Sequence, residues 1–139
     1  MPSKESNGNS NMWYSFRYGS AHFISLNTET NFHEAKERHH CDSGFHLCGG
    51  FSDDYLAWVE EDLKMASSDP NVKWIIAGGH REYDELFDHV ALFDLYGVDL
   101  YFAGHLHSYL RTFPMKFGTE QSYQNGNYFT LRETWIVAS

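Results

Sequence analysis

Two stretches of the chain have the same form: Trp74-Ile75-Ile76-Ala77-Gly78-Gly79-His80 and Leu100-Tyr101-Phe102-Ala103-Gly104-His105-Leu106-His107. Each is a short, continuous apolar run followed by glycine and then by histidine. Such runs are typical of strands that are buried on both faces of a parallel sheet. Because ligands of open α/β sheets bind beyond the carboxyl ends of the strands, we expect these histidines to emerge together at one edge.

The spacing of the histidines predicts a metal site. In an extended loop, His105 and His107 point to the same side, and His80 would join them from the neighbouring strand. Neutral imidazole is a good ligand for zinc, iron, copper and nickel, and a preceding glycine lets the backbone approach an ion closely. A single histidine on a loop is more often structural, but this repeated arrangement favours His80, His105 and His107 as metal ligands.

The rest of the pattern indicates an α/β fold with parallel strands in the middle of the sheet. Alternating or buried apolar residues predict further strands, and helical spacing predicts two helices whose ends carry a capping residue, a proline or a glycine. The expected strands cover 13–18, 21–27 and 134–138, and the expected helices run from Ser52 to before Pro70 and over 84–96, ending at Gly97.

Two segments carry no periodic pattern. Residues 1–11 are small and polar and are expected to be loose. Residues 28–50 form a long loop that contains four histidines and both cysteines. Cys41 and Cys48 could close a disulfide, or they could stay reduced; a structural zinc site with neighbouring histidines is a further alternative.

Composition narrows the class of protein. The 139 residues suit one domain, and the formal net charge of −9 is unsuited to nucleic acid or to an anionic membrane surface. No apolar run has the roughly 20 residues needed to span a bilayer, and the first ten residues have no apolar stretch that would mark a signal peptide.

The same motifs resemble a known family. Gly78-Gly79-His80-Arg81 and the run from Val98 to Tyr109 are similar to the last metal-binding blocks of the purple acid phosphatases, in the calcineurin-like metallophosphoesterase superfamily. Residues 11–26 resemble central strands of that catalytic domain, and residues 51–63 resemble the helix before its Gly-His-Arg block. The resemblance places this chain in the C-terminal part of the domain.

The resemblance implies a four-layer α/β/β/α sandwich, incomplete at both ends, with residues 1–139 forming one partial domain. It also implies a dinuclear centre in which iron is paired with zinc, manganese or a second iron. By motif position, His80 and His105 would bind the divalent metal and His107 the iron. Residues expected near these ligands are Arg81, Tyr109 and Arg111.

The activity implied is that of an acid phosphatase, in which metal-bound hydroxide attacks the phosphorus of a phosphate monoester. His89 would contact substrate or protonate the leaving group, although its position within the second expected helix would equally suit a surface histidine. The resemblance also implies a secreted, lysosomal or vacuolar location.

The departures from the family pattern carry information as well. The family's first three metal blocks, which supply its carboxylate ligands, have no counterpart here, and Met1-Pro2 resembles a point just beyond them. Glu82 and Leu110 replace the usual proline and glutamate. We therefore expect at most one weakly bound ion and negligible activity without the missing N-terminal half. The alternative is a catalytically inactive metal-binding or interaction module that keeps the fold.

Overall fold

The computed structural model describes residues 4–9, 12–29, 52–83, 86–105, 107–112, 115–116, 119–120 and 135–138. Residues 30–50 of the expected loop 28–50, including Cys41 and Cys48, lie outside these residues, so the disulfide and the alternative zinc site stay predictions. Ser6 belongs to the segment expected to be loose; its carbonyl oxygen accepts from Trp58 Nε1 at 2.8 Å and its Oγ from the Ser15 amide at 3.1 Å.

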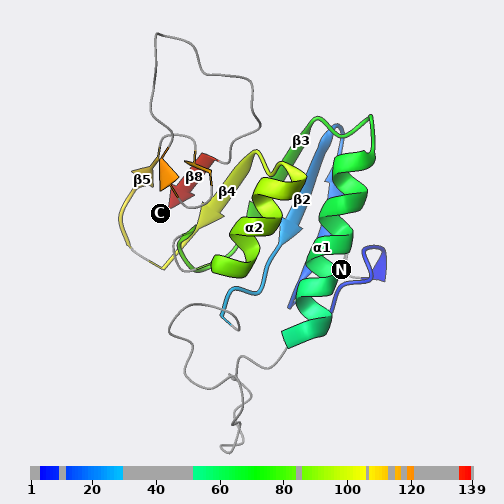
Figure 1. Cartoon of the computed structure of the whole chain (residues 1–139), viewed down its shortest axis with the longest axis horizontal. Helices are drawn as coiled ribbons and strands as arrows, with labels where there is room; N and C mark the ends of the chain where they lie inside the picture. Colours follow the sequence, from blue (N-terminus) through cyan, green and yellow to red (C-terminus); the bar gives the residue numbers. More distant parts are fainter. Residues whose placement is uncertain are drawn as a thin grey trace, which may run out of the picture.

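The described strands form a mixed six-stranded sheet in the order β1-β2-β3-β4-β8-β5 (Figure 1). The four central strands are parallel, and β1 and β5 are antiparallel to their neighbours. The strands are β1 Tyr14–Tyr18, β2 Ala21–Ser25, β3 Trp74–Gly78, β4 Leu100–Ala103, β5 Leu110–Arg111 and β8 Trp135–Ala138. The α/β class and the parallel pairing of the two strands that precede the histidines are confirmed.

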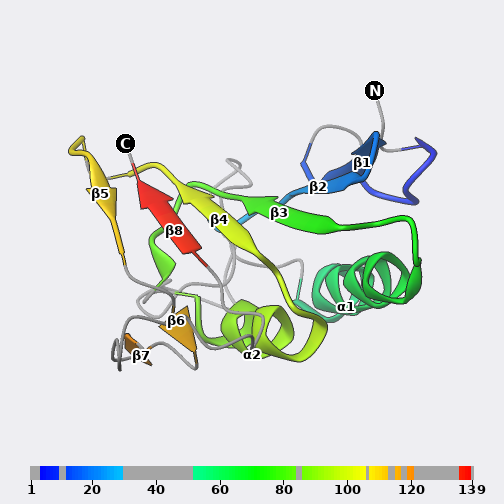
Figure 2. The ribbon, with the colours of Figure 1, turned by 90° about the horizontal axis from the view of Figure 1, so that it is seen from above.

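Two helices pack on one face of this sheet, α1 (Ser52–Ser68) and α2 (Phe87–Tyr96) (Figure 2). Helix α2 ends at Gly97 as predicted, because Gly97 adopts a left-handed conformation (φ 70°) and donates its amide to Phe93 at 2.9 Å. The helix begins later than residue 84, since Leu86 precedes it with non-helical backbone angles.

The core lies between the helices and the sheet. Helix α1 buries Tyr55, Val59 and Leu63, which are spaced four residues apart and so lie on one face. From the sheet, Ile75 and Ala77 of β3 face them, because alternate residues of a strand point to the same side. None of the helices among the described residues is long and apolar enough to cross a membrane.

The opposite face of the sheet is apolar and partly exposed. Phe16 and Phe23 are paired across β1 and β2 and stack with ring centroids 5.1 Å apart. Phe16 is 43% exposed and Phe102 is 45% exposed. Within the described ranges no second sheet covers this face. The other sheet in these ranges is a ladder of two short strands, β6 (Met115–Lys116) and β7 (Thr119–Glu120), with two residues each. The four-layer sandwich therefore stays a prediction.

Candidate functional site

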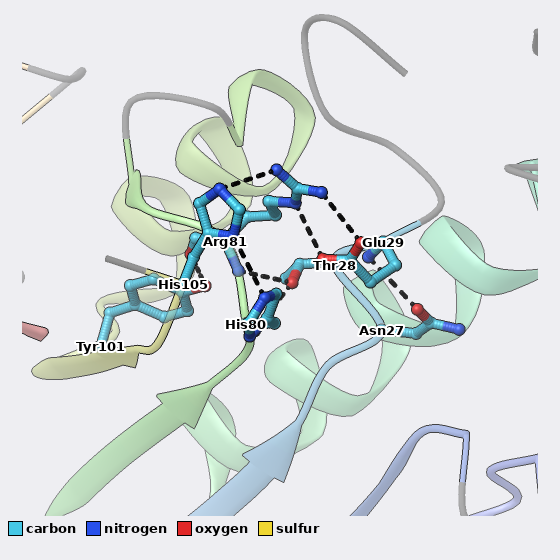
Figure 3. Close-up of polar contacts among 7 residues, drawn as sticks. All are labelled: Asn27, Thr28, Glu29, His80, Arg81, Tyr101 and His105. Atoms are coloured by element: carbon cyan, nitrogen blue, oxygen red, sulfur yellow. Dashed lines mark hydrogen bonds and ion pairs between the residues drawn. The ribbon is translucent and has the colours of Figure 1, made fainter. Parts of the chain in front are cut away.

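The carboxyl ends of β3 and β4 bring two of the expected ligands together. Nδ1 of His105 lies 3.2 Å from Nε2 of His80, and the rings meet edge to face with centroids 5.1 Å apart (Figure 3). The loops after the two strands are also joined through the backbone, because the amide of Gly104 donates to the carbonyl of His80 at 3.0 Å. The predicted convergence thus holds for His80 and His105.

The glycines before these histidines are required by close packing. A Cβ atom at Gly79 would lie 2.7 Å from the hydroxyl oxygen of Tyr101 and would also collide with Thr28. A Cβ atom at Gly104 would lie 3.2 Å from Nδ1 of His80. A side chain at Gly79 would therefore displace Thr28 or Tyr101, whereas a side chain at Gly104 would require the His80 ring to move by a few tenths of an ångström.

His107 is the third expected ligand. The backbone of His105 is in the left-handed region (φ 69°), and Leu106, which follows it, lies outside the described residues. His107 is exposed, and among the residues that the structure describes no group of three or more His, Cys, Asp or Glu side chains is arranged to hold a metal. The place of His107 beside the His80–His105 pair therefore stays a prediction.

Arg81 connects the histidine pair to an acidic residue. Its guanidinium group binds both carboxylate oxygens of Glu29, at 2.8 and 3.0 Å, and Nη1 lies 3.2 Å from Nε2 of His105. The hydrogen bond from Arg81 lowers the pKa of Glu29 below its ordinary value, against the opposing effect of partial burial. Since a guanidinium only donates, Nε2 of His105 accepts; a neutral His105 therefore carries its proton on Nδ1 and donates it to His80.

Thr28 and Tyr101 hold the backbone of the turn that carries these side chains. Oγ1 of Thr28 accepts the amides of His80 and Arg81, both at 2.9 Å, and the Tyr101 hydroxyl donates to the carbonyl of Arg81 at 2.6 Å (Figure 3). Sequence reasoning missed Thr28 and Glu29. The available signal was their position just after a predicted strand whose carboxyl end lies at the same edge.

His89 lies away from this edge, inside the core. It is fully buried in the first turn of α2, and its Nε2 lies 2.9 Å from the hydroxyl oxygen of Tyr55. Burial lowers the pKa of His89 to about 4, so the imidazole is neutral at neutral pH. The alternative of a helix-surface histidine is wrong, and the geometry gives no support to a contact with substrate.

Tyr109 and Arg111 lie further along the loop and strand that follow β4. Both are exposed, and Arg111 belongs to β5 at the edge of the sheet. Their expected place beside the metal ligands stays a prediction, whereas Arg81 does contact His105.

A cavity of about 500 Å³ opens on the uncovered face of the sheet and reaches the site. Its walls include aromatic and aliphatic side chains of β1 to β4, and His80 and Gly79 lie at its margin. An apolar wall that ends at an imidazole is suited to the organic part of a ligand whose polar end reaches the histidines.

The chemistry of the donor pair fits part of a metal site. Two imidazole nitrogens bonded at about 2.0–2.1 Å to one tetrahedral metal lie about 3.3 Å apart. The 3.2 Å between Nδ1 of His105 and Nε2 of His80, which a hydrogen bond joins here, is close to that separation, so a metal could replace the shared proton. The described residues add no carboxylate to the pair in a ligand arrangement, so these residues fit two positions of a centre and not a whole one.

Relatives of this chain include several acid phosphatases. No family model matches it. An acid phosphatase from Aspergillus ficuum is 29% identical in an alignment that covers 83% of this chain and 24% of that protein. Acid phosphatase type 7 from Mus musculus is 32% identical, with coverage of 77% and 27%. The chain therefore spans about a quarter of the length of these relatives.

A solved structure has the same fold. A purple acid phosphatase from the seeds of yellow lupin (Lupinus luteus) matches with a TM-score of 0.63 at 23% identity, over 91% of this chain and 22% of that one. Purple acid phosphatase 18 from Arabidopsis thaliana is 30% identical over 81% of this chain. Over most of its length, the chain is therefore homologous to the acid phosphatases, the purple acid phosphatases among them.

Proposed function

We propose that this chain supplies the histidine side of the metal centre of an acid-phosphatase-type phosphomonoesterase. The observation that carries the proposal is the His80–His105 pair, whose 3.2 Å separation is the spacing of two ligands on one metal. His107, two residues along the same loop, is proposed as the ligand of the second, iron position. The substrate is a phosphate monoester, and the location is extracellular, lysosomal or vacuolar.

The chain's own residues have defined tasks in this function. His80 and His105 offer imidazole nitrogens as metal ligands. Arg81 keeps a positive charge beside them, which suits a phosphate dianion. The apolar cavity next to His80 would receive the organic part of the ester. When bound, a pair of metals would lower the pKa of water and neutralise charge on the phosphate.

The histidines alone are insufficient for catalysis. Neutral imidazoles do not offset the charge of a trivalent and a divalent ion, and carboxylate ligands must do so. Among the described side chains no carboxylate joins the histidine pair in a ligand cluster. The same observation favours the second candidate, a catalytically inactive metal-binding or interaction module.

Hydrolysis of p-nitrophenyl phosphate near pH 5, with iron and zinc supplied, tests the proposal. We expect negligible turnover by the 139-residue chain and turnover when the N-terminal half of a homologous acid phosphatase domain is supplied. His80→Ala and His107→Ala should each abolish that turnover, whereas His22→Gln, on β2 and bonded to Asp62 of α1, should keep it. Failure of the combined protein to turn over would favour the inactive module. Robust turnover by the chain alone would contradict the need for added carboxylates.

A further inference from the structure

Thr28 contacts the turn after β3 at three consecutive residues. Its side chain is 1% exposed, and Oγ1 accepts the amide protons of His80 and Arg81 at 2.9 Å each. Its methyl group fills the space where a Cβ atom of Gly79 would lie. A single buried side chain, three residues beyond the end of β2, thus contacts Gly79 and holds the amides of His80 and Arg81.

The other backbone groups of this turn are fixed from β4 and the loop after it. The amide of Gly79 donates to the carbonyl of Phe102, and the carbonyl of His80 accepts from the amide of Gly104, both at 3.0 Å. The carbonyl of Arg81 accepts from the Tyr101 hydroxyl at 2.6 Å. The amides of His80 and Arg81 are bonded instead to the hydroxyl of Thr28, in the segment that follows β2.

Loss of that hydroxyl would remove the acceptor that the two amides of the turn share. A part-buried amide that loses its acceptor is unfavourable, so the turn would move to restore a hydrogen bond. His80 has its backbone inside this turn and would move with it. A shift of a few tenths of an ångström at a ligand is enough to weaken a metal site, because metal–nitrogen bonds tolerate only about ±0.2 Å.

We propose that Thr28 is a positioning residue, which sets the His80 imidazole at ligand distance from His105 by accepting the amides of His80 and Arg81. The inference deepens the proposed function and rests on His80 and His105 being ligands. It assigns to the segment after β2 a role at the site that is separate from the histidine motifs after β3 and β4. Thr28 acts through the backbone and does not itself contact the bound group.

The experiment compares Thr28→Val, which keeps the shape and removes the hydroxyl, with Thr28→Ser, which keeps the hydroxyl. Ser15→Ala is the control, because it removes another buried hydroxyl that is bonded to Asp62 on the helix side of the sheet. Two quantities are measured on the 139-residue chain: hydrogen exchange of the peptide containing the His80 and Arg81 amides, and zinc affinity. Subtracting the binding of His80→Ala removes the contribution of the other histidines.

We expect Thr28→Val to speed exchange at these amides and to weaken His80-dependent zinc binding about 10- to 100-fold, as for other residues that orient metal ligands. Thr28→Ser should restore both, and Ser15→Ala should change neither. Unchanged exchange or unchanged zinc affinity in Thr28→Val would overturn the proposal. So would a Thr28→Ser chain that folds and binds zinc as weakly as Thr28→Val.

The two possible failures are distinguishable. If the native chain shows no His80-dependent zinc binding, the metal function proposed above is wrong, and amide exchange alone decides whether Thr28 fixes the turn. If Thr28→Val does not fold, Thr28→Ser decides the outcome. The Thr28→Ser chain must then fold and show both native amide exchange and native zinc affinity. A Thr28→Ser chain that lacks native exchange or native zinc affinity contradicts the inference.

Discussion

Nη1 of Arg81 donates to Nε2 of His105 across 3.2 Å, while the rest of the guanidinium group is held by Glu29. A positive charge therefore lies against Nε2 of one of the two proposed ligands, whose other ring nitrogen, Nδ1, faces His80. The carboxylate that could attract a metal is at the same time neutralised by the arginine. Arg81 consequently opposes the first step of metal capture, even though its charge suits an anionic substrate.

From this relationship we predict that Arg81→Gln tightens His80-dependent zinc binding by about tenfold. The substitution removes a positive charge a few ångströms from the site and frees the Glu29 carboxylate, and a factor of ten corresponds to about 1.4 kcal/mol. Isothermal titration with zinc measures the effect. Arg17→Gln is the matched control, because Arg17 lies on the edge strand β1 and pairs with Asp69, which is outside the proposed site. Weaker binding in Arg81→Gln would show that the arginine supports the ligands.

The buried His89 predicts loss of stability in acid. Its pKa is about 4 in the folded chain and about 6.5 when unfolded, so the unfolded state binds more protons between these values. The contribution of neutral His89 to the free energy of unfolding is fully present above pH 6.5 and is lost as the pH falls towards 4. The difference of 2.5 pKa units corresponds to a loss of about 3 kcal/mol. Urea unfolding at pH 7 and pH 4.5 measures this loss. His89→Phe should flatten the dependence, whereas the exposed His107→Gln should leave its slope unchanged.

The uncovered sheet face predicts self-association of the chain. Phe16 and Phe102 are both partly exposed on this face, and large apolar patches promote contacts between copies. We expect Phe16→Lys to shift the sedimentation profile towards the monomer. Met65→Lys is the control, because Met65 is 53% exposed on α1, which packs on the other side of the sheet. Equal effects of the two substitutions would mean that general charge, and not this face, governs association.

Asp62 is predicted to be a strong stabilising residue. It is 2% exposed on α1, and its two carboxylate oxygens bind Ser15 of β1 and His22 of β2, the latter at 2.7 Å. Asp62→Ala leaves both partners without an acceptor and should lower the free energy of unfolding by about 3 kcal/mol. The shift of the urea midpoint measures it. The neighbouring Glu61 is exposed, so Glu61→Ala should change stability by less than about 0.5 kcal/mol.

The sequence was sufficient for the parallel strands and for the meeting of His80 with His105, because continuous apolar runs followed by glycine define where a strand ends. It was insufficient for the backbone of His105, which is left-handed where the motif implied an extended loop, and the place of His107 beside the pair stays a prediction. Thr28 and Glu29 were missed for a similar reason. Their role depends on the register that sets β2 beside β3, with Ser25 opposite Gly78.

The helical faces were predicted in part. Helical spacing of the apolar residues predicts that Leu56, Val59, Leu63 and Ala66 share the buried face of the first helix. Val59, Leu63 and Ala66 are buried, but Leu56 is only partly buried, and Tyr55 is fully buried instead. His89 shows the limit of polarity as a guide: apolar spacing alone left it as a possible surface residue. Its burial becomes acceptable only when the Tyr55 hydroxyl is available as a partner, and that hydroxyl comes from another helix.

The place of β8 in the sheet has a consequence for the order of folding. β8 (Trp135–Ala138) lies between β4 and β5, although both of these precede it in the chain. β5 therefore has no neighbour in the sheet until Trp135–Ala138 has been synthesised and has inserted beside β4. During synthesis the edge of β4, next to the histidine loop, stays open until that late event. The nascent chain would then be most vulnerable to mispairing at the strand end that carries its proposed ligands.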